Sequence, residues 1–279
     1  MPTPPRPFPA RLHILLARES PRAVVIRRGP TRHTAVIGWD RKTDRFELGQ
    51  WLYGRVYERR SDLSPDGRHL ISFAMNGRWT SAVKGSWTAV SRAPWLKAEA
   101  LYAKGDCWHG GGLFLDNQRF WLNDGYGHEA QRETPRLVRV SDYPWHEAYG
   151  GECPGVYFIR LQRDGWAMKH THTAADGDTV TCFDKRVSGH WLLRKLAHAS
   201  LTRRQGQGVY HDTHELHNER TGETVPMTGW EWAEVDGGRL VWAQAGRLHA
   251  GRLEAAGLRS QKVLHDFNAM TFERREAPY

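Results

Sequence analysis

The densest group of side chains able to bind a metal is the stretch His211-Asp212-Thr213-His214-Glu215-Leu216-His217. Imidazole and carboxylate groups are the ligands that zinc and iron take in proteins. On a β-strand, His211, Glu215 and His217 share one face and His214 points to the other, because side chains alternate. The spacing is not His-Glu-x-x-His, and the stretch runs into a polar turn. We therefore interpret these residues as strand histidines rather than metal ligands.

A second pair of imidazoles, His170 and His172, lies on one side of another predicted strand. Two ligands do not make a metal site, and Asp176-Gly177-Asp178 just beyond is typical of a turn. The sequence thus offers five weak metal candidates, and we predict neither a bound metal nor a cofactor.

The string Cys107-Trp108-His109-Gly110-Gly111-Gly112 combines a thiol, an imidazole and three glycines. A nucleophilic cysteine beside a base, or an anion cradled by backbone amides, is one interpretation. No third residue that would orient the histidine can be identified. We favour a crossing where glycines let strands approach closely.

Carboxylates near predicted strand ends leave a hydrolase open as an alternative, since a glycosidase needs an acid and its partner about 5–9.5 Å apart. The sequence selects no pair from these, and it lacks nucleophile-elbow, Walker-type and dinucleotide-binding motifs. The candidates are Asp40, Asp62, Asp106, Glu152, Asp184 and Glu231.

Three of the 13 tryptophans, Trp108, Trp145 and Trp230, lie beside Gly, Pro, His or acidic residues, a setting that favours loops. Aromatic side chains on loops can anchor a protein interface or stack on bases and sugars. We take these three as the candidate partner-binding residues. The partner expected is another protein, with nucleic acid as the alternative.

The charge balance is basic, with 40 Lys and Arg against 31 Asp and Glu, a formal net charge of +9. A basic chain invites a nucleic-acid interpretation, but the arginines occur as short pairs at turns rather than as one stripe. The three cysteines contain no Cys-x-x-Cys pair, which fits free thiols in a reducing compartment. With no apolar run long enough to span a bilayer, we expect a cytoplasmic protein without membrane contact, led by a mobile Pro-rich segment over residues 1–10.

The elements that must position these residues are predicted to be short antiparallel strands punctuated by Gly, Asp and Pro. We assign strands to 23–26, 34–39, 113–115, 119–122, 156–161, 239–243 and 247–250. Two segments of helical composition, 94–105 and 188–197, are also assigned as strands because each follows a hairpin-like segment. The strand at 12–16 is expected to share a sheet with the tail at 263–272, which would close the sheet edge.

The clearest turn is Ser64-Pro65-Asp66-Gly67-Arg68, which leads into the apolar strand 69–73. Weaker echoes occur at Arg22, Asn117, Asp164 and Asp236. Together with Asp66 these markers are separated by 44, 51, 47 and 72 residues. Three of these steps match a four-stranded propeller blade of roughly 40–50 residues.

The stretch Leu63 to Phe73 resembles the repeat of WD-like, TolB-type β-propeller proteins. The resemblance implies an architecture and no particular activity, and it implies that Asp66 is structural. The predicted fold is all-β, a single β-propeller over residues 11–279 with five, or alternatively six, four-stranded antiparallel blades. The predicted function is a non-catalytic scaffold that docks a macromolecular partner; a propeller hydrolase and a nucleic-acid binder are the alternatives.

Overall fold

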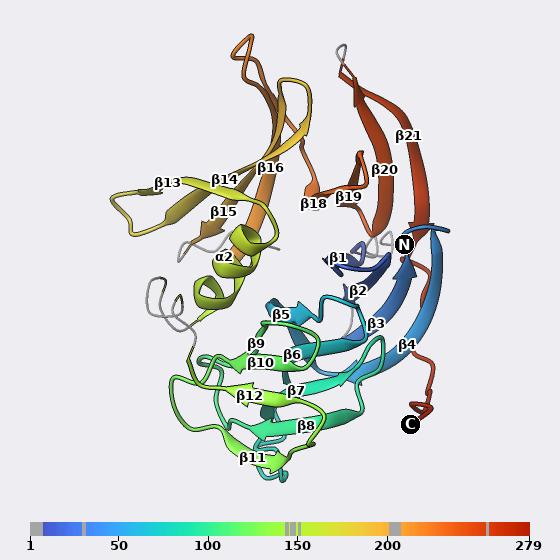
Figure 1. Ribbon diagram of the computed structural model, residues 1–279, viewed down its shortest axis with the longest axis vertical. Helices are drawn as coiled ribbons and strands as arrows, with labels where there is room; N and C mark the ends of the chain where they lie inside the picture. Colours follow the sequence, from blue (N-terminus) through green and yellow to red (C-terminus); the bar gives the residue numbers. More distant parts are fainter. Residues whose placement is uncertain are drawn as a thin grey trace, which may run out of the picture. The chain divides into compact units, whose positions relative to one another are not determined.

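The computed structural model describes residues 8–29, 32–142, 145, 149, 152–200, 208–254 and 257–279. In this part of the chain, 21 strands form five sheets, and the chain also contains the helix α2 (Figure 1). Residues 8–10 of the expected leader are described, and 1–7 lie outside the described residues. Chain contacts divide the protein into two units, residues 1–160 with 270–279 and residues 161–269. The single domain over 11–279 stays a prediction.

The first sheet of unit 1 is an antiparallel meander in the order β1-β2-β3-β4. Its strands alternate with tight polar turns, and apolar side chains from both of its inner strands are buried. The strands are β1 (Arg11–Leu16), β2 (Arg22–Arg28), β3 (His33–Asp40) and β4 (Arg45–Tyr53).

The second and third sheets of unit 1 follow along the chain, in the orders β11-β8-β7-β6-β5 and β12-β10-β9. The segment of helical composition at 94–105 contains strand β8, which confirms the assignment. The strands are β5 (Arg55–Leu63), β6 (His69–Met75), β7 (Ser86–Arg92), β8 (Ala98–Ala103), β9 (Gly112–Phe114), β10 (Arg119–Leu122), β11 (Glu129–Arg132) and β12 (Val138–Val140).

Unit 2 contains two further antiparallel sheets, in the orders β13-β14-β15-β16-β17 and β18-β19-β20-β21. The strand predicted within 188–197 is confirmed as part of β15. The strands are β13 (Ala167–Thr173), β14 (Thr179–Ser188), β15 (Trp191–Ala199), β16 (Tyr210–Asn218), β17 (Thr224–Pro226), β18 (Trp230–Asp236), β19 (Arg239–Gln244), β20 (Arg247–Glu254) and β21 (Gly257–Asp266).

The strand predicted at 156–161 was wrong, because the helix α2 (Cys153–Arg163) occupies this stretch. Pro154 fits the first turn of a helix, where its missing N–H costs nothing. Buried residues at 153, 156, 157 and 160 follow the i, i+3, i+4, i+7 spacing of one helical face. Val156 and Ile159 pack on Leu113 and Trp121 of the third sheet.

The core of unit 1 lies between consecutive sheets that pack face to face. Leu15, Val24 and Val36 of the first sheet contact Val56 and Leu70 of the second. The second and third sheets meet through another cluster, formed by Ile71, Val90, Ala100, Tyr102, Phe114, Phe120, Leu122 and Leu137.

The expected pairing of the N-terminal strand with the tail was wrong. β1 is the edge strand of its sheet and pairs with β2, whereas β21 pairs with β20. Residues 270–279 do return to unit 1, but they form no strand there. Part of the predicted segment, at Val263, His265 and Asp266, is already paired with β20, and the contacts of 270–279 with the first sheet run through side chains.

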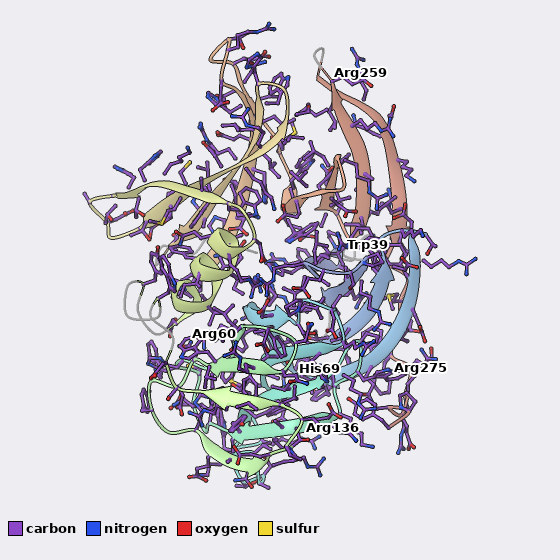
Figure 2. All side chains as sticks on the ribbon, viewed as in Figure 1. Trp39, Arg60, His69, Arg136, Arg259 and Arg275 are labelled. Carbon is purple, nitrogen blue, oxygen red and sulfur yellow. The ribbon has the colours of Figure 1, made fainter. Side chains whose placement is uncertain are left out.

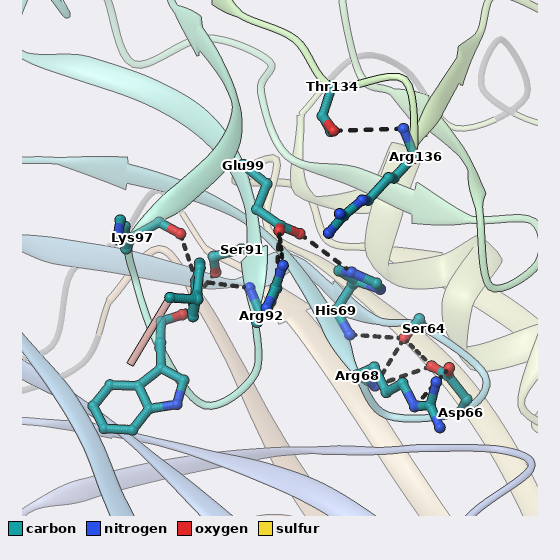
Figure 3. A network of polar contacts seen from close by, with 12 residues as sticks. Ser64, Asp66, Arg68, His69, Ser91, Arg92, Lys97, Glu99, Thr134 and Arg136 are labelled. Atoms are coloured by element: carbon teal, nitrogen blue, oxygen red, sulfur yellow. Dashed lines mark hydrogen bonds and ion pairs between the residues drawn. The ribbon is translucent and has the colours of Figure 1, made fainter. Parts of the chain in front are cut away.

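The turn at Ser64–Arg68 is confirmed as a compact link between β5 and β6. The Ser64 hydroxyl accepts the N–H groups of Arg68 and His69 at 3.1 and 2.9 Å. It donates to the Asp66 carboxylate at 2.7 Å, so both side chains serve the turn (Figure 3). The marker at Asp164 differs, because it follows α2; the corresponding hairpin turn of the fourth sheet is at Asp176-Gly177, between β13 and β14.

Candidate binding surface

Three loops at one end of the second and third sheets form the candidate surface. They are residues 76–85 between β6 and β7, 104–111 between β8 and β9, and 123–128 between β10 and β11. Each presents one exposed aromatic side chain: Trp79, Trp108 and Tyr126 are 53%, 55% and 52% exposed. We call these three residues the aromatic loop surface.

Hydrogen bonds join the loops to one another. At the end of the first loop, Ser86, the first residue of β7, accepts the Gly105 N–H at 3.0 Å through its hydroxyl and donates to the Asp106 carbonyl at 2.6 Å. Gly110 and Asn123 are joined by a backbone hydrogen bond of 2.9 Å. The three loops therefore form one connected surface.

The glycines at 110–112 are required by close packing, as the sequence predicted. A Cβ atom on Gly111 would lie 1.8 Å from the Arg60 carbonyl oxygen, and one on Gly112 would lie 2.1 Å from the Trp121 carbonyl oxygen. Gly110 and Gly111 have φ values of +83° and +76°, which side chains of L-residues rarely adopt. The string is thus a strand crossing that fixes the loop carrying Trp108.

Arg60, on β5, fixes this loop from below. Its guanidinium donates to the Cys107 carbonyl at 2.7 Å and to the His109 carbonyl. It also lies 3.5 Å from the Glu152 carboxylate and is buried (Figure 2). A charged donor that holds two loop carbonyls makes the loop stiff.

Tyr126 lies over a buried cation. The Lys104 ammonium is 3.6 Å from the centre of the Tyr126 ring and 3.0 Å from the Asp106 carboxylate. The His109 imidazole meets the same ring edge-on at 5.3 Å. Burial, followed by the charges of Lys104 and Arg60, lowers the pKa of His109. The imidazole is therefore neutral at pH 7 and packs as an aromatic ring.

An Asp-His-Thr arrangement below the surface was not foreseen from the sequence. The His128 Nδ1 is 2.8 Å from Asp124 Oδ1, and its Nε2 is 3.3 Å from the Thr88 hydroxyl. Such an order could activate a hydroxyl. However, Thr88 is fully buried and its hydroxyl accepts the Gly111 N–H at 2.8 Å. The arrangement therefore braces the glycine crossing, and a substrate cannot reach the hydroxyl.

The structure separates the three candidate partner-binding tryptophans. Trp108 belongs to the aromatic loop surface, and Trp145 is also exposed, at 53%. Trp230 is buried and stacks on Trp242 with ring centres 4.6 Å apart, so in unit 2 it packs the core. Sequence reasoning missed Trp79 and Tyr126, although the neighbouring Asn76-Gly77 and Gly125-Gly127 glycines were turn signals.

The histidine candidates do not converge. Among the described residues, no group of three or more His, Cys, Asp or Glu side chains could hold a metal ion. His170 and His172 lie on the exposed strand β13. On β16, His214 is buried and its Nε2 is 3.1 Å from the Lys195 ammonium. His211 stacks on His198, and His217 contacts Thr224.

The candidate carboxylates mostly have structural partners. Asp62 accepts the Phe114 N–H, Asp184 binds the Arg194 guanidinium, and Asp40 accepts the Lys42 N–H. Asp106 and Glu152 pair with Lys104 and Arg60 as described. Glu231 lies on β18 and is half-buried. These contacts single out no acid and partner for hydrolysis.

The chain was compared with protein families and with curated proteins. No family model matches the chain, and no curated protein matches it either. In the part of the chain that the structure describes, no helix is long and apolar enough to cross a membrane.

Proposed function

We propose that this protein is a non-catalytic binding module that docks a protein partner through Trp79, Trp108 and Tyr126. The observation that carries the proposal is that three half-exposed aromatic side chains stand on loops bonded to one another. Large aromatic residues on a preformed surface lose little conformational freedom on binding and are frequent hot spots.

The local charges favour a protein over nucleic acid. Acidic groups near the aromatic loop surface are already paired with bases: Glu129 with Lys84, Asp106 with Lys104, and Asp124 with Arg139. Lys84, Lys104 and Arg139 are therefore each neutralised by a carboxylate. A nucleic-acid site needs a contiguous basic face, whereas a largely neutralised aromatic surface suits a protein interface.

For the fold, we propose a five-bladed β-propeller of the WD-like, TolB type. The support is that the described strands form five sheets, antiparallel apart from the parallel pair β10 and β12, and that the sheets of unit 1 pack face to face. Propellers often serve as docking platforms, which is an analogy of fold and not evidence of function.

The proposal is tested by affinity capture from nuclease-treated lysate, followed by a titration with the purified partner. Trp108→Ala and Trp79→Ala are expected to weaken that binding about 30-fold or more, since hot-spot tryptophans contribute at least about 2 kcal/mol. Val263→Ala removes an exposed apolar side chain in unit 2 and serves as the control. A partner bound equally by wild type and by both tryptophan variants would contradict the proposal, as would loss of all binding after nuclease treatment.

A further inference from the structure

Residues 270–279 lie across the first and second sheets of unit 1 and make specific contacts without forming a strand. Two side chains of the sheet bind main-chain carbonyls of this tail. Arg27 donates to the Met270 carbonyl at 3.4 Å, and the Gln50 amide donates to the Arg275 carbonyl at 2.9 Å. Contacts to carbonyl groups hold a backbone irrespective of its side chains.

Three side chains of the tail make contacts that depend on the residue type, so they determine which sequence can bind here. Phe272 lies 5.2 Å from the His33 ring and 6.3 Å from the Trp51 ring. Arg275 donates to the Leu48 carbonyl at the edge strand β4 and lies over the Trp95 ring (Figure 2). The pattern is thus an aromatic residue followed, three positions later, by an arginine.

The third anchor is Tyr279, held between two cations. Its hydroxyl donates to the Lys97 carbonyl at 2.6 Å and accepts the Arg92 N–H at 3.0 Å. The Arg92 guanidinium lies 4.5 Å and the Lys97 ammonium 5.3 Å from the centre of the Tyr279 ring. A tyrosine four positions after the arginine completes the pattern.

The tail lies where two elements of unit 1 meet, and we call this place the groove. Its walls are β4 and the loop between β7 and β8, which pack so closely that a Cβ atom on Gly49 would lie 1.9 Å from the Pro94 carbonyl oxygen. Gln50 also accepts the Leu96 N–H at 2.8 Å, which ties the two walls together. Arg92 is fixed by Glu99 at 2.8 Å, and Glu99 in turn contacts His69 (Figure 3). None of these bonds within the walls involves a residue of the tail.

The tail, by contrast, contributes little to the core. None of residues 271–279 is buried, and Phe272 is 55% exposed. A segment held by a few anchors opens at low free energy without unfolding what lies beneath it.

We propose that this groove is a peptide-binding site, which the chain's own tail occupies in the free protein. Its ligand is a segment of a partner protein with an aromatic residue, an arginine three positions later and a tyrosine four positions after that. The partner segment displaces the tail by making the same contacts. A tethered tail acts at an effective concentration of roughly millimolar, so loosening the tail strengthens the apparent affinity for an added peptide.

The test measures fluorescence anisotropy of a labelled peptide of residues 268–279 added to the full chain. The full-length Arg275→Ala/Tyr279→Ala protein has a weakened tail and an intact groove. It is expected to bind the peptide at least about tenfold more tightly than wild type does, because its groove is mostly free.

Two peptide variants separate specific from general binding. An Arg275→Ala peptide is expected to lose about tenfold or more in affinity. An Arg274→Ala peptide is the matched control, since Arg274 is 85% exposed and pairs only weakly, at 3.8 Å, with Glu276 of the tail. If the double protein variant fails to fold by circular dichroism, Tyr279→Phe in the full chain, which removes only the hydroxyl, replaces it.

No binding of the peptide to the loosened protein up to about 1 mM, the effective concentration of the tail, would overturn the proposal. Equal binding of both peptide variants would also overturn it. So would concentration-dependent dimers in light scattering with the peptide left unbound, since a second copy of the chain would then be the occupant. Trp108→Ala is expected to leave peptide binding unchanged, so this test is independent of the aromatic loop surface.

Discussion

At the scale of single residues, the candidate surface depends on glycines, at positions where no side chain fits, and on buried titratable groups bonded to carboxylates. The glycines at 110–112 allow two strands and a loop to cross, and Arg60 binds the carbonyls that this crossing exposes. Below the surface, Tyr102 is buried, the His128 side chain is covered, and both are bonded to carboxylates. The close packing at the glycines and the pKa of the buried phenol can both be measured.

Gly111→Ala is expected to lower the free energy of unfolding by about 3 kcal/mol, because the new methyl group would overlap the Arg60 carbonyl oxygen at a positive φ. Gly77→Ala is the matched control: it also has a positive φ, of +73°, but nothing lies within 4 Å of its Cβ position. It should cost about 1 kcal/mol, for the backbone conformation alone. Urea unfolding measures both, and equal losses would contradict the close approach.

Burial and the neighbouring Glu133 raise the pKa of Tyr102 to about 12. Below pH 10 the phenol is neutral in the folded and unfolded states. Between pH 10 and 12 the unfolded chain releases this proton and the folded chain keeps it, so stability should fall as the pH rises. Tyr102→Phe is expected to make that fall shallower in urea unfolding; an unchanged slope would show that Tyr102 does not contribute.

At the scale of elements, tight turns specify which strands pair. Ser64 and Asp66 bind the backbone of their own turn, and the Asp66 N–H is bonded to the Asn117 side chain from the next sheet at 2.8 Å. A local motif thereby also connects consecutive sheets. In α2, by contrast, the local signal was ambiguous, because the short run 156–161, apolar except for Arg160, fits a strand or a buried helix.

Ser64→Ala is expected to destabilise the fold by about 1–3 kcal/mol, since the part-buried His69 N–H loses its acceptor and the Arg68 N–H keeps only Asp66. Arg68→Ala, in the same turn, removes a side chain that is 71% exposed and pairs only with Asp66 at 3.6 Å. It should change stability by less than about 0.5 kcal/mol. Thermal unfolding followed by circular dichroism compares the two; similar losses would show that the serine hydroxyl is not what holds the turn.

At the scale of the whole molecule, five sheets fall into two compact units. A closed propeller would make these units fold cooperatively, as one domain. Independent units would unfold separately, and the proposal of one ring therefore has a thermodynamic consequence.

Calorimetry is expected to show one transition, which Gly111→Ala in unit 1 and Trp242→Ala in unit 2 both shift to lower temperature. Trp242 is 2% exposed and stacks between Trp230 and His249, so its loss should cost about 3–5 kcal/mol. Two transitions, each sensitive to one of the substitutions, would contradict a single propeller domain.

The sequence by itself determined the all-β class, most strand positions and the turn at Ser64–Arg68, because alternation, Gly, Pro and Asp act locally. It also predicted that Gly110–Gly112 mark a close crossing and that His214 faces away from His211. It did not determine that 153–163 is a helix, that Trp230 is buried or that the tail lies on β4 and the β7–β8 loop. Those depend on which surfaces meet in space. Trp79, Trp108 and Tyr126 lie on separate loops, and the pairing of the flanking strands together with the hydrogen bonds at Ser86 and Gly110 brings them to one surface.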